Sequence, residues 1–270
     1  MAASLSVSIV LFAPPQTPSF EAVWESLYQA VEDAVTHGVL SKTEVTLIDN
    51  GQNEDLFKAD VATPDFMHFS YLKNDKNLGY SAHNQSINPS TADLHLVLNP
   101  DVLLHRSALT NGINYLNSSP ETAMICPYSL DAQGAPSYLC KRYPALLDLL
   151  LRGFAAPRIR RRFDNRLKHY EYRDLDIEAV AESIELISGC CMLARTSALQ
   201  ACAGFDAGFF LYFEDYDLSI RMRKQGRLDY EPAMKITHFG GNAARKGLKH
   251  IFYFARSAAR FYCKHGFRFV

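Results

Sequence analysis

Short apolar segments alternate with a segment of helical periodicity through the first 105 residues, and this alternation restricts the fold more than any other feature. Residues 20–37 repeat apolar side chains at three- and four-residue intervals and stop before Gly38, which predicts a helix. The strand-like segments are 7–12, 44–48, 69–72 and 94–98. Apolar strands alternating with a helix indicate an α/β fold with a buried, mainly parallel sheet flanked by helices.

Polar residues directly follow two of these predicted strands. Asp49 and Asn50 end the segment that begins at residue 44, and Asn99 and Asp101 follow the segment 94–98. Ligands of open α/β sheets bind beyond the carboxyl ends of the strands, so we expect a ligand site there. The Asn-Pro-Asp tripeptide has two interpretations, an oxygen-ligand site for a divalent cation or a simple turn.

The composition fits a folded domain. The chain has 270 residues, of which 48% are hydrophobic and 21% charged, and this excludes disordered, collagen-like and coiled-coil proteins. No apolar run reaches the roughly 18 residues of a membrane-spanning helix. The six cysteines have neither CxxC nor Cys/His metal spacing, which predicts reduced thiols in a cytoplasmic protein.

Charge is balanced overall but uneven along the chain. The net charge is −1, yet residues 141–168 hold nine Lys/Arg against two acids, and residues 244–270 hold seven Lys/Arg and no acid. Such asymmetry indicates an anionic partner, and a solvated basic surface is the alternative. Neither segment spaces aromatic residues for base stacking, so we expect no nucleic acid partner.

Two further groups are candidates for chemistry. Glu214, Asp215 and Asp217 lie within four positions among aromatic neighbours, and Asp217 is predicted to cap a helix over 217–225. Acids in apolar surroundings have raised pKa values, which suits a general base, whereas the alternative is a loop whose acids face water. His238 follows a strand-like run and precedes a glycine pair, so it is a candidate for binding metal or phosphate, and a structural histidine is the alternative.

Together these segments resemble glycosyltransferase family 2, the inverting transferases of GT-A fold that use nucleotide-sugars. The longest matches are ISGCCMLAR at 187–195, GFDAGFFLYFEDYDLSIR at 204–221 and HFGG at 238–241, with shorter ones at 48–50, 77–80 and 98–101. The similarity is greatest to the rhamnosyltransferase-like branch that builds bacterial surface polysaccharides. It implies one GT-A-type domain over 1–270, with a nucleotide-sugar-binding half (1–105), an acceptor and catalytic half (106–243) and a C-terminal basic amphipathic helix (244–270).

The resemblance also implies roles for individual residues. Asp215 would be the general base, with Glu214 beside it. Asp101 would bind Mg²⁺ or Mn²⁺, and His238 would help to hold the metal or the diphosphate. The residues implied to contact the nucleotide-sugar are Phe12, Asp49, Asn50, Asn77, Gly79, Tyr80, Asn99 and Gly189. Two positions depart from the family pattern: Ala13 stands where an Asn is usual, and Asn99 replaces the first Asp of the DxD motif, which removes a charge from the metal site.

The activity that the resemblance implies is transfer of a sugar by a single in-line displacement. The implied donor is a nucleotide-diphosphate sugar, dTDP-L-rhamnose, and the implied acceptor is a saccharide or a lipid-diphosphate-linked saccharide. Asn99 raises an alternative from another class, a catalytically silent module that binds a sugar-nucleotide or a polysaccharide with the same fold.

An apolar stripe in the last predicted helix, over 246–264, favours a membrane surface as a further partner. The stripe comprises Leu248, Ile251, Phe252, Ala255, Ala258, Ala259 and Tyr262, with basic residues off it. Such a helix binds an anionic surface, and residues 145–151 followed by 158–162 offer a second apolar-then-basic element. Packing of the stripe on the sheet is the alternative. We therefore expect a cytoplasmic protein that is peripheral on the inner face of the cytoplasmic membrane if the stripe is exposed.

Overall fold

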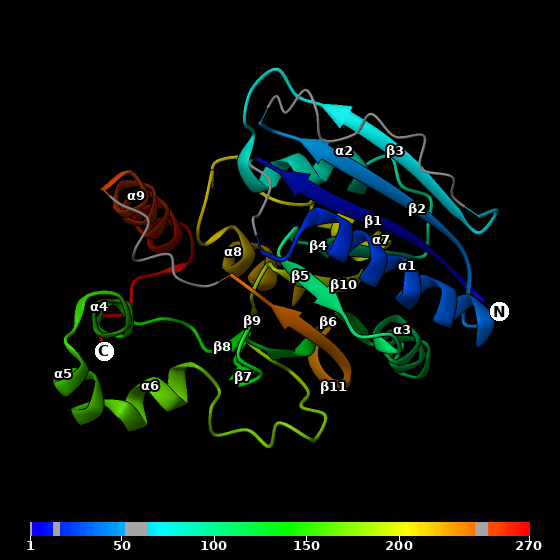
Figure 1. The fold of residues 1–270 in the computed structure, drawn as a ribbon. Coiled ribbons are helices and arrows are strands. Elements are labelled where there is room, and N and C mark those ends of the chain that lie inside the picture. The colour runs from blue at the N-terminus through cyan, green and yellow to red at the C-terminus, as the bar shows by residue number, and fades with distance from the viewer. Residues whose placement is uncertain (1, 13–16, 52–63, 241–247) are drawn as a thin grey trace.

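The computed structural model describes residues 2–12, 17–51, 64–240 and 248–270. Ala13, the second glycine of the pair after His238 and the start of the predicted C-terminal helix lie outside these residues. Figure 1 shows a central sheet with helices around it and a group of helices to one side. The strand order is β3-β2-β1-β4-β10-β6-β11-β5, and β7 pairs with β6. These strands are β1 (Ala3–Leu11), β2 (Leu40–Asp49), β3 (Met67–Lys73), β4 (Leu94–Leu98), β5 (Val102–Leu104), β6 (Thr122–Leu130), β7 (Pro136–Ser137), β10 (Cys191–Arg195) and β11 (Arg227–His238).

The sheet is mixed but mainly parallel, as predicted: β3, β2, β1 and β4 are parallel to one another, and β6 and β11 form a second parallel pair. Strand β10 lies between β4 and β6 and is antiparallel to both. Every residue of β4 is buried, because helices cover both faces of the sheet, and this explains its continuous apolar sequence.

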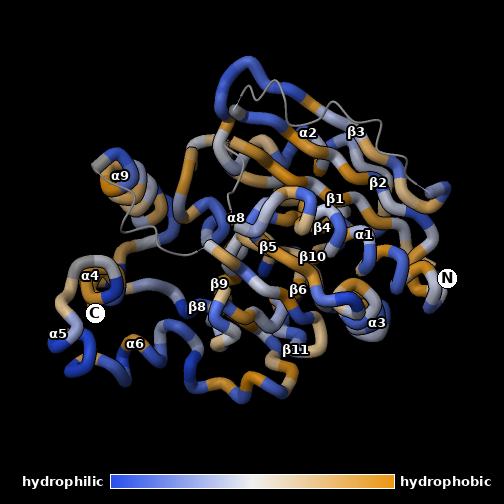
Figure 2. Tube along the Cα trace, viewed as in Figure 1, coloured by the Kyte–Doolittle hydropathy of each residue, from blue (hydrophilic) through white to orange (hydrophobic). Residues whose placement is uncertain are grey.

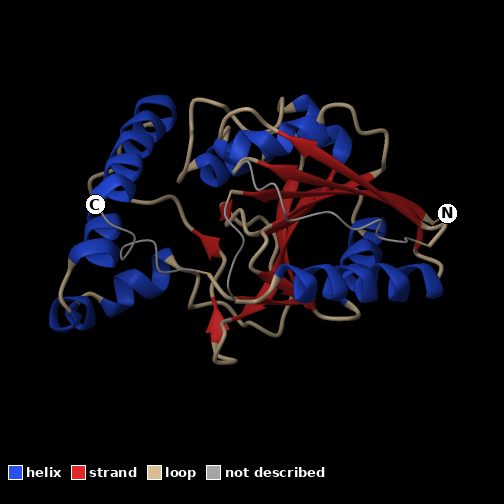
Figure 3. Ribbon diagram, turned by 45° about the horizontal axis from the view of Figure 1, so that its top comes forward, coloured by secondary structure: helices blue, strands red, loops and turns tan. Residues whose placement is uncertain are grey.

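Helices lie on both sides of the sheet, as Figure 3 shows. Helices α1 and α3 pack against each other on one face, and η1, α2, α7 and α8 lie on the other. The helices are α1 (Phe20–Thr36), the 3-10 helix η1 (Gly79–His83), α2 (Asn84–Ile87), α3 (Ala108–Ser118), α4 (Leu146–Phe154), α5 (Pro157–Arg162), α6 (Asp164–Tyr170), α7 (Thr196–Ala201), α8 (Glu214–Met222) and α9 (Leu248–His265). The α/β class is therefore confirmed.

We call the group formed by α4, α5, α6 and α9 the helical lobe. It packs on a second apolar cluster that includes Leu149, Tyr170, Phe213, Tyr216 and Phe261, separate from the core of the sheet. The small strand pair β8 (Cys140–Lys141) and β9 (Leu186–Ile187) joins the lobe to the sheet. In Figure 2 the central strands are largely hydrophobic and α5 is strongly hydrophilic. Among the described residues, none of the helices is both long and apolar enough to cross a membrane.

Two local predictions are wrong. Helix α8 begins at Glu214, three residues before the predicted start, and its N-cap is Phe213 in a left-handed conformation with φ 64°. Asp217 is therefore not a cap but a fully buried residue inside the helix. The segment predicted as two strands, 227–230 and 234–237, is the single strand β11, whose pairing with β6 is interrupted by a register shift between Glu231 and Lys235.

Candidate active site

Asp101 and His238 are brought together by the pairing of two strands. Strand β11 runs antiparallel to β5, and its last residue, His238, lies opposite Val102. The Nε2 atom of His238 is 3.5 Å from Oδ1 of Asp101. A Cβ atom on Gly240 would lie only 2.3 Å from Oδ2 of Asp101 and 2.7 Å from Nε2 of His238, so a larger residue there would displace these two groups. The sequence prediction that these two residues act as one unit is consistent with this geometry.

These two side chains fit a divalent metal that the substrate helps to bind. A carboxylate oxygen and an imidazole nitrogen suit Mn²⁺, and the carboxylate suits Mg²⁺. Within the part of the chain that the structure describes, no three His, Cys, Asp or Glu side chains are grouped as metal ligands. Burial acts to lower the pKa of His238, but Cys190 and Asp101 outweigh it and raise the pKa to about 10. A metal would therefore have to displace a proton from this imidazole.

The predicted donor residues form one hydrogen-bonded series across the strand ends. The Asn50 side chain donates to the Gly79 carbonyl (3.1 Å), and the Gly79 amide donates to Oδ1 of Asn77 (2.8 Å). The Tyr80 hydroxyl donates to Oδ1 of Asn99 and, at 3.1 Å, to the carbonyl of Gly189. Asn99 is thus engaged with Tyr80 in the position where the family pattern has an acid.

Gly79 has a backbone reason to be glycine. Its φ is +61°, and a Cβ atom there would lie 2.0 Å from the carbonyl oxygen of Phe210. The close approach joins η1 to the loop that leads into α8, since Phe210 precedes that helix by four residues. The glycine therefore holds the donor-side segment against the segment that carries the acids.

Asp49 and Phe12 lie at the ends of β2 and β1. Asp49 is 1% exposed and accepts hydrogen bonds from the Tyr71 hydroxyl (2.8 Å) and the Gly51 amide (2.7 Å). Burial and the neighbouring Asp49 raise the pKa of Tyr71 to about 12. Phe12 is 62% exposed at the sheet edge. Asp49 therefore links the end of β2 to Tyr71 of β3, and Phe12 lies largely exposed at the end of β1.

Asp215 is held by two backbone amides at the start of α8. Its Oδ2 accepts from the Gly189 amide (3.0 Å) and its Oδ1 from the Tyr216 amide (2.9 Å). Burial raises the pKa of Asp215 to about 6, against the lowering effect of these hydrogen bonds and of Lys141. Gly189, predicted as a donor residue, thus links Tyr80 to the acid pair through its two backbone groups.

Glu214 differs from Asp215 in its surroundings. Its side chain is 5% exposed, and its Oε2 atom has no hydrogen-bond partner among the described residues. Burial, and then the charge of Asp215, raise the pKa of Glu214 well above its usual value. The raised pKa favours the neutral form of Glu214 beside a charged Asp215, and the two acids titrate as a pair.

A cavity of about 260 Å³ connects these groups, and we call it the catalytic cavity. Glu214, Asp215, His238 and Gly240 all line it. The sequence analysis did not predict other residues in its wall, namely Tyr138, Lys141, Arg152, Tyr170 and Tyr212. Lys141 and Arg152 belong to the basic segment 141–168, but charge alone did not separate them from the exposed arginines of α5.

Comparison with known proteins gives the family. The family model described as "Glycosyltransferase like family 2" matches residues 27–239. The chain is 27% identical to the rhamnosyltransferase WbbL of Escherichia coli over 199 residues, covering 72% of this chain and 67% of that protein. It is 27% identical over 247 residues to the N-acetylglucosaminyl-diphospho-decaprenol L-rhamnosyltransferase of Mycobacterium tuberculosis, covering 87% of this chain and 75% of that protein.

Solved structures show the same fold. The crystal structure of GalNAc-T7 with UDP, GalNAc and Mn²⁺ matches with a TM-score of 0.61 at 13% identity, over 97% of this chain but only 50% of that one. Staphylococcus aureus TarS 1–349 matches with a TM-score of 0.55 at 10% identity, over 97% of this chain and 72% of that one. These neighbours are GT-A glycosyltransferases, and the predicted GT-A fold is confirmed. Because the family model covers well over half of its residues, the chain belongs to glycosyltransferase family 2.

Proposed function

We propose that Asp215 is the general base of an inverting sugar transfer from a nucleotide-diphosphate donor. The observation that carries this proposal is the pair Glu214 and Asp215 in the wall of a cavity that also reaches Asp101's neighbour His238. A base works best when its pKa lies near the working pH, and burial raises the pKa of Asp215 toward that pH. Family membership supports the reaction class.

The reaction is a single displacement at the anomeric carbon. The acceptor oxygen forms the new bond to that carbon, and its proton passes to the Asp215 carboxylate. The bond from the anomeric carbon to the diphosphate oxygen breaks, and its electron pair leaves with the nucleoside diphosphate. Glu214 remains neutral beside Asp215 and keeps a second negative charge out of the cavity. Asp101 and His238 would hold a divalent metal, which supplies neutralisation of the leaving diphosphate when bound.

We assign the donor side to the strand ends of β1, β2 and β4 and to η1. Asp49, Asn50, Asn77 and Tyr80 supply polar groups, and Phe12 supplies an apolar face for the nucleoside. The relatives are named as rhamnosyltransferases, and this supports dTDP-L-rhamnose as the donor. A screen of nucleotide-sugars for metal-dependent release of nucleoside diphosphate tests this assignment, with release from dTDP-L-rhamnose expected to be fastest. A protein that binds donors yet neither hydrolyses nor transfers any would instead be the silent module.

Removal of the metal is expected to abolish part of the nucleotide affinity. With Mn²⁺ present, a nucleoside diphosphate at about 100 times its Kd stabilises the protein by about 2.7 kcal/mol. Asp101→Ala should lose the metal-dependent share of this stabilisation, and EDTA should remove the same share from the wild type. Thermal unfolding with Mn²⁺ or EDTA measures both, and Asp65→Ala, which removes an exposed acid outside the site, is the control. Equal stabilisation of the wild type in EDTA contradicts the metal assignment.

We propose that the acceptor is a lipid-linked saccharide presented at an anionic membrane surface. A relative is named for a diphospho-decaprenol acceptor. In α9 the predicted stripe divides: Ile251 and Phe252 are exposed, whereas Tyr262 at its C-terminal end is buried in the second apolar cluster beside Phe261. The helical lobe also exposes Leu150, Ile159, Phe267 and Phe269 beside exposed basic residues, namely Arg158, Arg160, Arg161, Arg162, Lys249, Arg256 and Arg268.

Binding to vesicles is expected to depend on both charge and apolar side chains. Each basic residue near an anionic surface contributes about 1 kcal/mol, and salt screens this attraction. The wild type should sediment with anionic but not neutral vesicles at low salt, and high salt should release it. Phe267→Ser combined with Phe269→Ser should weaken sedimentation, whereas Val180→Ser, which alters an exposed apolar residue outside the lobe, should not. Absence from both pellets at low salt would reject the surface.

A further inference from the structure

Lys141 is a buried cation in the wall of the catalytic cavity. Its side chain is 4% exposed, and it lines the cavity together with Asp215. Its Nζ atom donates to the carbonyls of Tyr138 and Cys140, the latter at 3.3 Å. Among the described residues, no carboxylate oxygen forms an ion pair with Lys141 within 4.0 Å. An ammonium group has three N–H donors, so the two carbonyls leave one donor over.

A buried ammonium group without a carboxylate partner is costly to the folded state. The usual outcomes are pairing with an acid or a lowered pKa. Burial, and then the nearby Arg152, lower the pKa of Lys141 to about 8, so the group still carries its charge at neutral pH. Retention of a charge without a direct ion-pair partner in a cavity is typical of a group that meets an opposite charge on a ligand.

Arg152 adds a second positive charge to the same cavity wall. It projects from α4, and its Nε lies 3.2 Å from Oε1 of Glu171, so one acid neutralises part of its charge. Lys141 and Arg152 come from β8 and α4, which carry none of the residues that we assign to the donor. Helix α4 belongs to the helical lobe, so Arg152 reaches the cavity from the lobe, whereas His238 lines the same cavity from β11.

We propose that Lys141 and Arg152 bind a phosphate-class anionic group of the acceptor. This inference rests on the proposed function, since it takes the cavity beside Asp215 to be the acceptor site. The anion is the diphosphate of a lipid-linked saccharide or a phosphate on a free saccharide, and both present the same chemistry to an ammonium and a guanidinium group. The cations hold this group while the acceptor hydroxyl reaches Asp215.

The competing interpretation is that Lys141 only holds the turn at 138–141 through its two carbonyl contacts. Lys141→Met distinguishes the anion-binding role from the structural role, because methionine fills a similar volume without the charge. Under the proposal this change removes a buried charge that has no direct ion-pair partner, so the melting temperature stays equal or rises while phosphate binding is lost. A structural role predicts the reverse, a lower melting temperature with phosphate binding unchanged.

The test measures binding of inorganic phosphate to the full chain by calorimetry, with the donor site filled by a saturating nucleoside diphosphate and Mn²⁺. We expect Lys141→Met to weaken phosphate binding at least tenfold and Arg152→Gln to weaken it severalfold. Lys168→Gln is the matched control, since Lys168 is exposed and paired with Asp164 at 2.9 Å outside the cavity. Arg152→Gln, an exposed position, keeps the test decisive if Lys141→Met does not fold. Unchanged phosphate binding in both variants overturns the proposal.

Two further probes identify the source of the anion. Geranyl diphosphate carries an apolar chain, and glucose 1-phosphate does not. Tighter binding of geranyl diphosphate to the wild type indicates a lipid-linked acceptor, and tighter binding of glucose 1-phosphate indicates a free saccharide. In both cases the affinity should fall in Lys141→Met. Failure of the proposed function would appear differently: no nucleotide-sugar would be consumed, although phosphate binding still depended on Lys141.

Discussion

Asp215→Asn is expected to lower the rate of sugar transfer by about 10²–10⁴-fold, the usual contribution of a general base. The carboxamide keeps the shape of the side chain but cannot accept the proton of the acceptor hydroxyl. Nucleotide affinity should change little, because the donor residues lie at the strand ends of β1, β2 and β4. Initial rates of nucleoside diphosphate release and calorimetric binding of the nucleotide measure the two effects separately.

Glu214→Gln is the matched comparison for this prediction. Burial and Asp215 raise the pKa of Glu214 and so favour its neutral form, which glutamine reproduces. Its loss of rate should be much smaller than that of Asp215→Asn. A larger loss for Glu214→Gln would move the base to Glu214, and an Asp215→Asn rate within a few-fold of the wild type would remove Asp215 from the mechanism.

The pH dependence of the wild type provides a second measurement of the same assignment. Burial raises the pKa of Asp215 to about 6, and the base is active only when deprotonated. The value of kcat/KM should therefore be constant between this pKa and that of Lys141, about 8, and fall about tenfold per unit as the pH drops below the pKa of Asp215. The acid limb belongs to the pair Glu214 and Asp215, since their titrations interact. A rate that stays flat to about pH 4.5 in a folded sample is inconsistent with this base, whose pKa exceeds the usual value.

The sequence predicted that the candidate site residues gather at one edge of the sheet because the geometry of parallel strands is regular, and their roles stay predictions. Asp49, Asn50 and Asn99 follow apolar strands, and such strand ends meet at one edge of a sheet. The strand order in the C-terminal half of the chain was less predictable, because β10 lies between β4 and β6 and is antiparallel to both. Its apolar sequence is the same for either direction, so the pattern could not fix the orientation.

Burial of charged side chains was the feature that the sequence did not reveal. Lys141 lies in a strongly basic segment, and nothing in the sequence separates its buried ammonium group from the exposed arginines of α5. The α9 stripe had two interpretations for the same reason, since periodicity identifies an apolar face but not its partner. The structure leaves Ile251 and Phe252 exposed and turns Phe261 toward the second apolar cluster.

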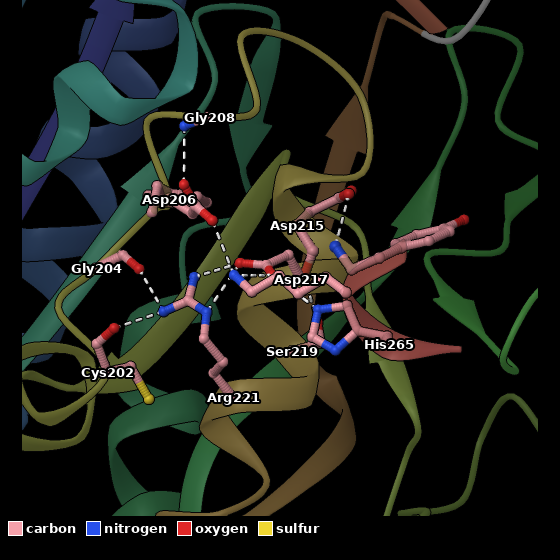
Figure 4. Close-up of polar contacts among 12 residues, drawn as sticks. Cys202, Gly204, Asp206, Gly208, Asp215, Asp217, Ser219, Arg221 and His265 are labelled. Carbon is pink, nitrogen blue, oxygen red and sulfur yellow. Dashed lines mark hydrogen bonds and ion pairs between the residues drawn. The ribbon is translucent and has the colours of Figure 1, made fainter. Parts of the chain in front are cut away.

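Asp217, predicted as a helix cap, is instead the centre of an ionic network that joins α8 to α9. Its carboxylate lies 2.7 Å from both Arg221 and Lys264 and 2.8 Å from Nε2 of His265. Figure 4 shows Asp217 between Arg221 of its own helix and His265 of α9. Arg221 also donates to the carbonyl of Gly204 (2.8 Å), so the network reaches the loop before α8. Asp217 is fully buried, two residues from Asp215.

Asp217→Asn is expected to destabilise the protein by about 3–5 kcal/mol, the usual effect of removing one partner from a buried ionic network. The carboxamide leaves the positive charges of Arg221 and Lys264 without their shared counterion. Asp206→Asn is the matched control: Asp206 also pairs with Lys264, but its other partner Arg260 is 46% exposed, so the loss should be about 1 kcal/mol or less. Denaturant unfolding at neutral pH measures both differences.

The pH dependence of the stability lost in Asp217→Asn tests whether this loss arises from the charge of Asp217. Burial acts to raise the pKa of Asp217, but Lys264, His265 and Arg221 outweigh it and lower the pKa. A carboxylate whose pKa is lowered by folding contributes stability that is complete above its unfolded pKa of about 3.9 and disappears as the pH falls through its folded pKa. The difference between wild type and Asp217→Asn should therefore be constant near neutral pH and shrink below about pH 4. A difference that persists unchanged in acid would mean that packing of α8, rather than the charge of Asp217, holds α9 in place.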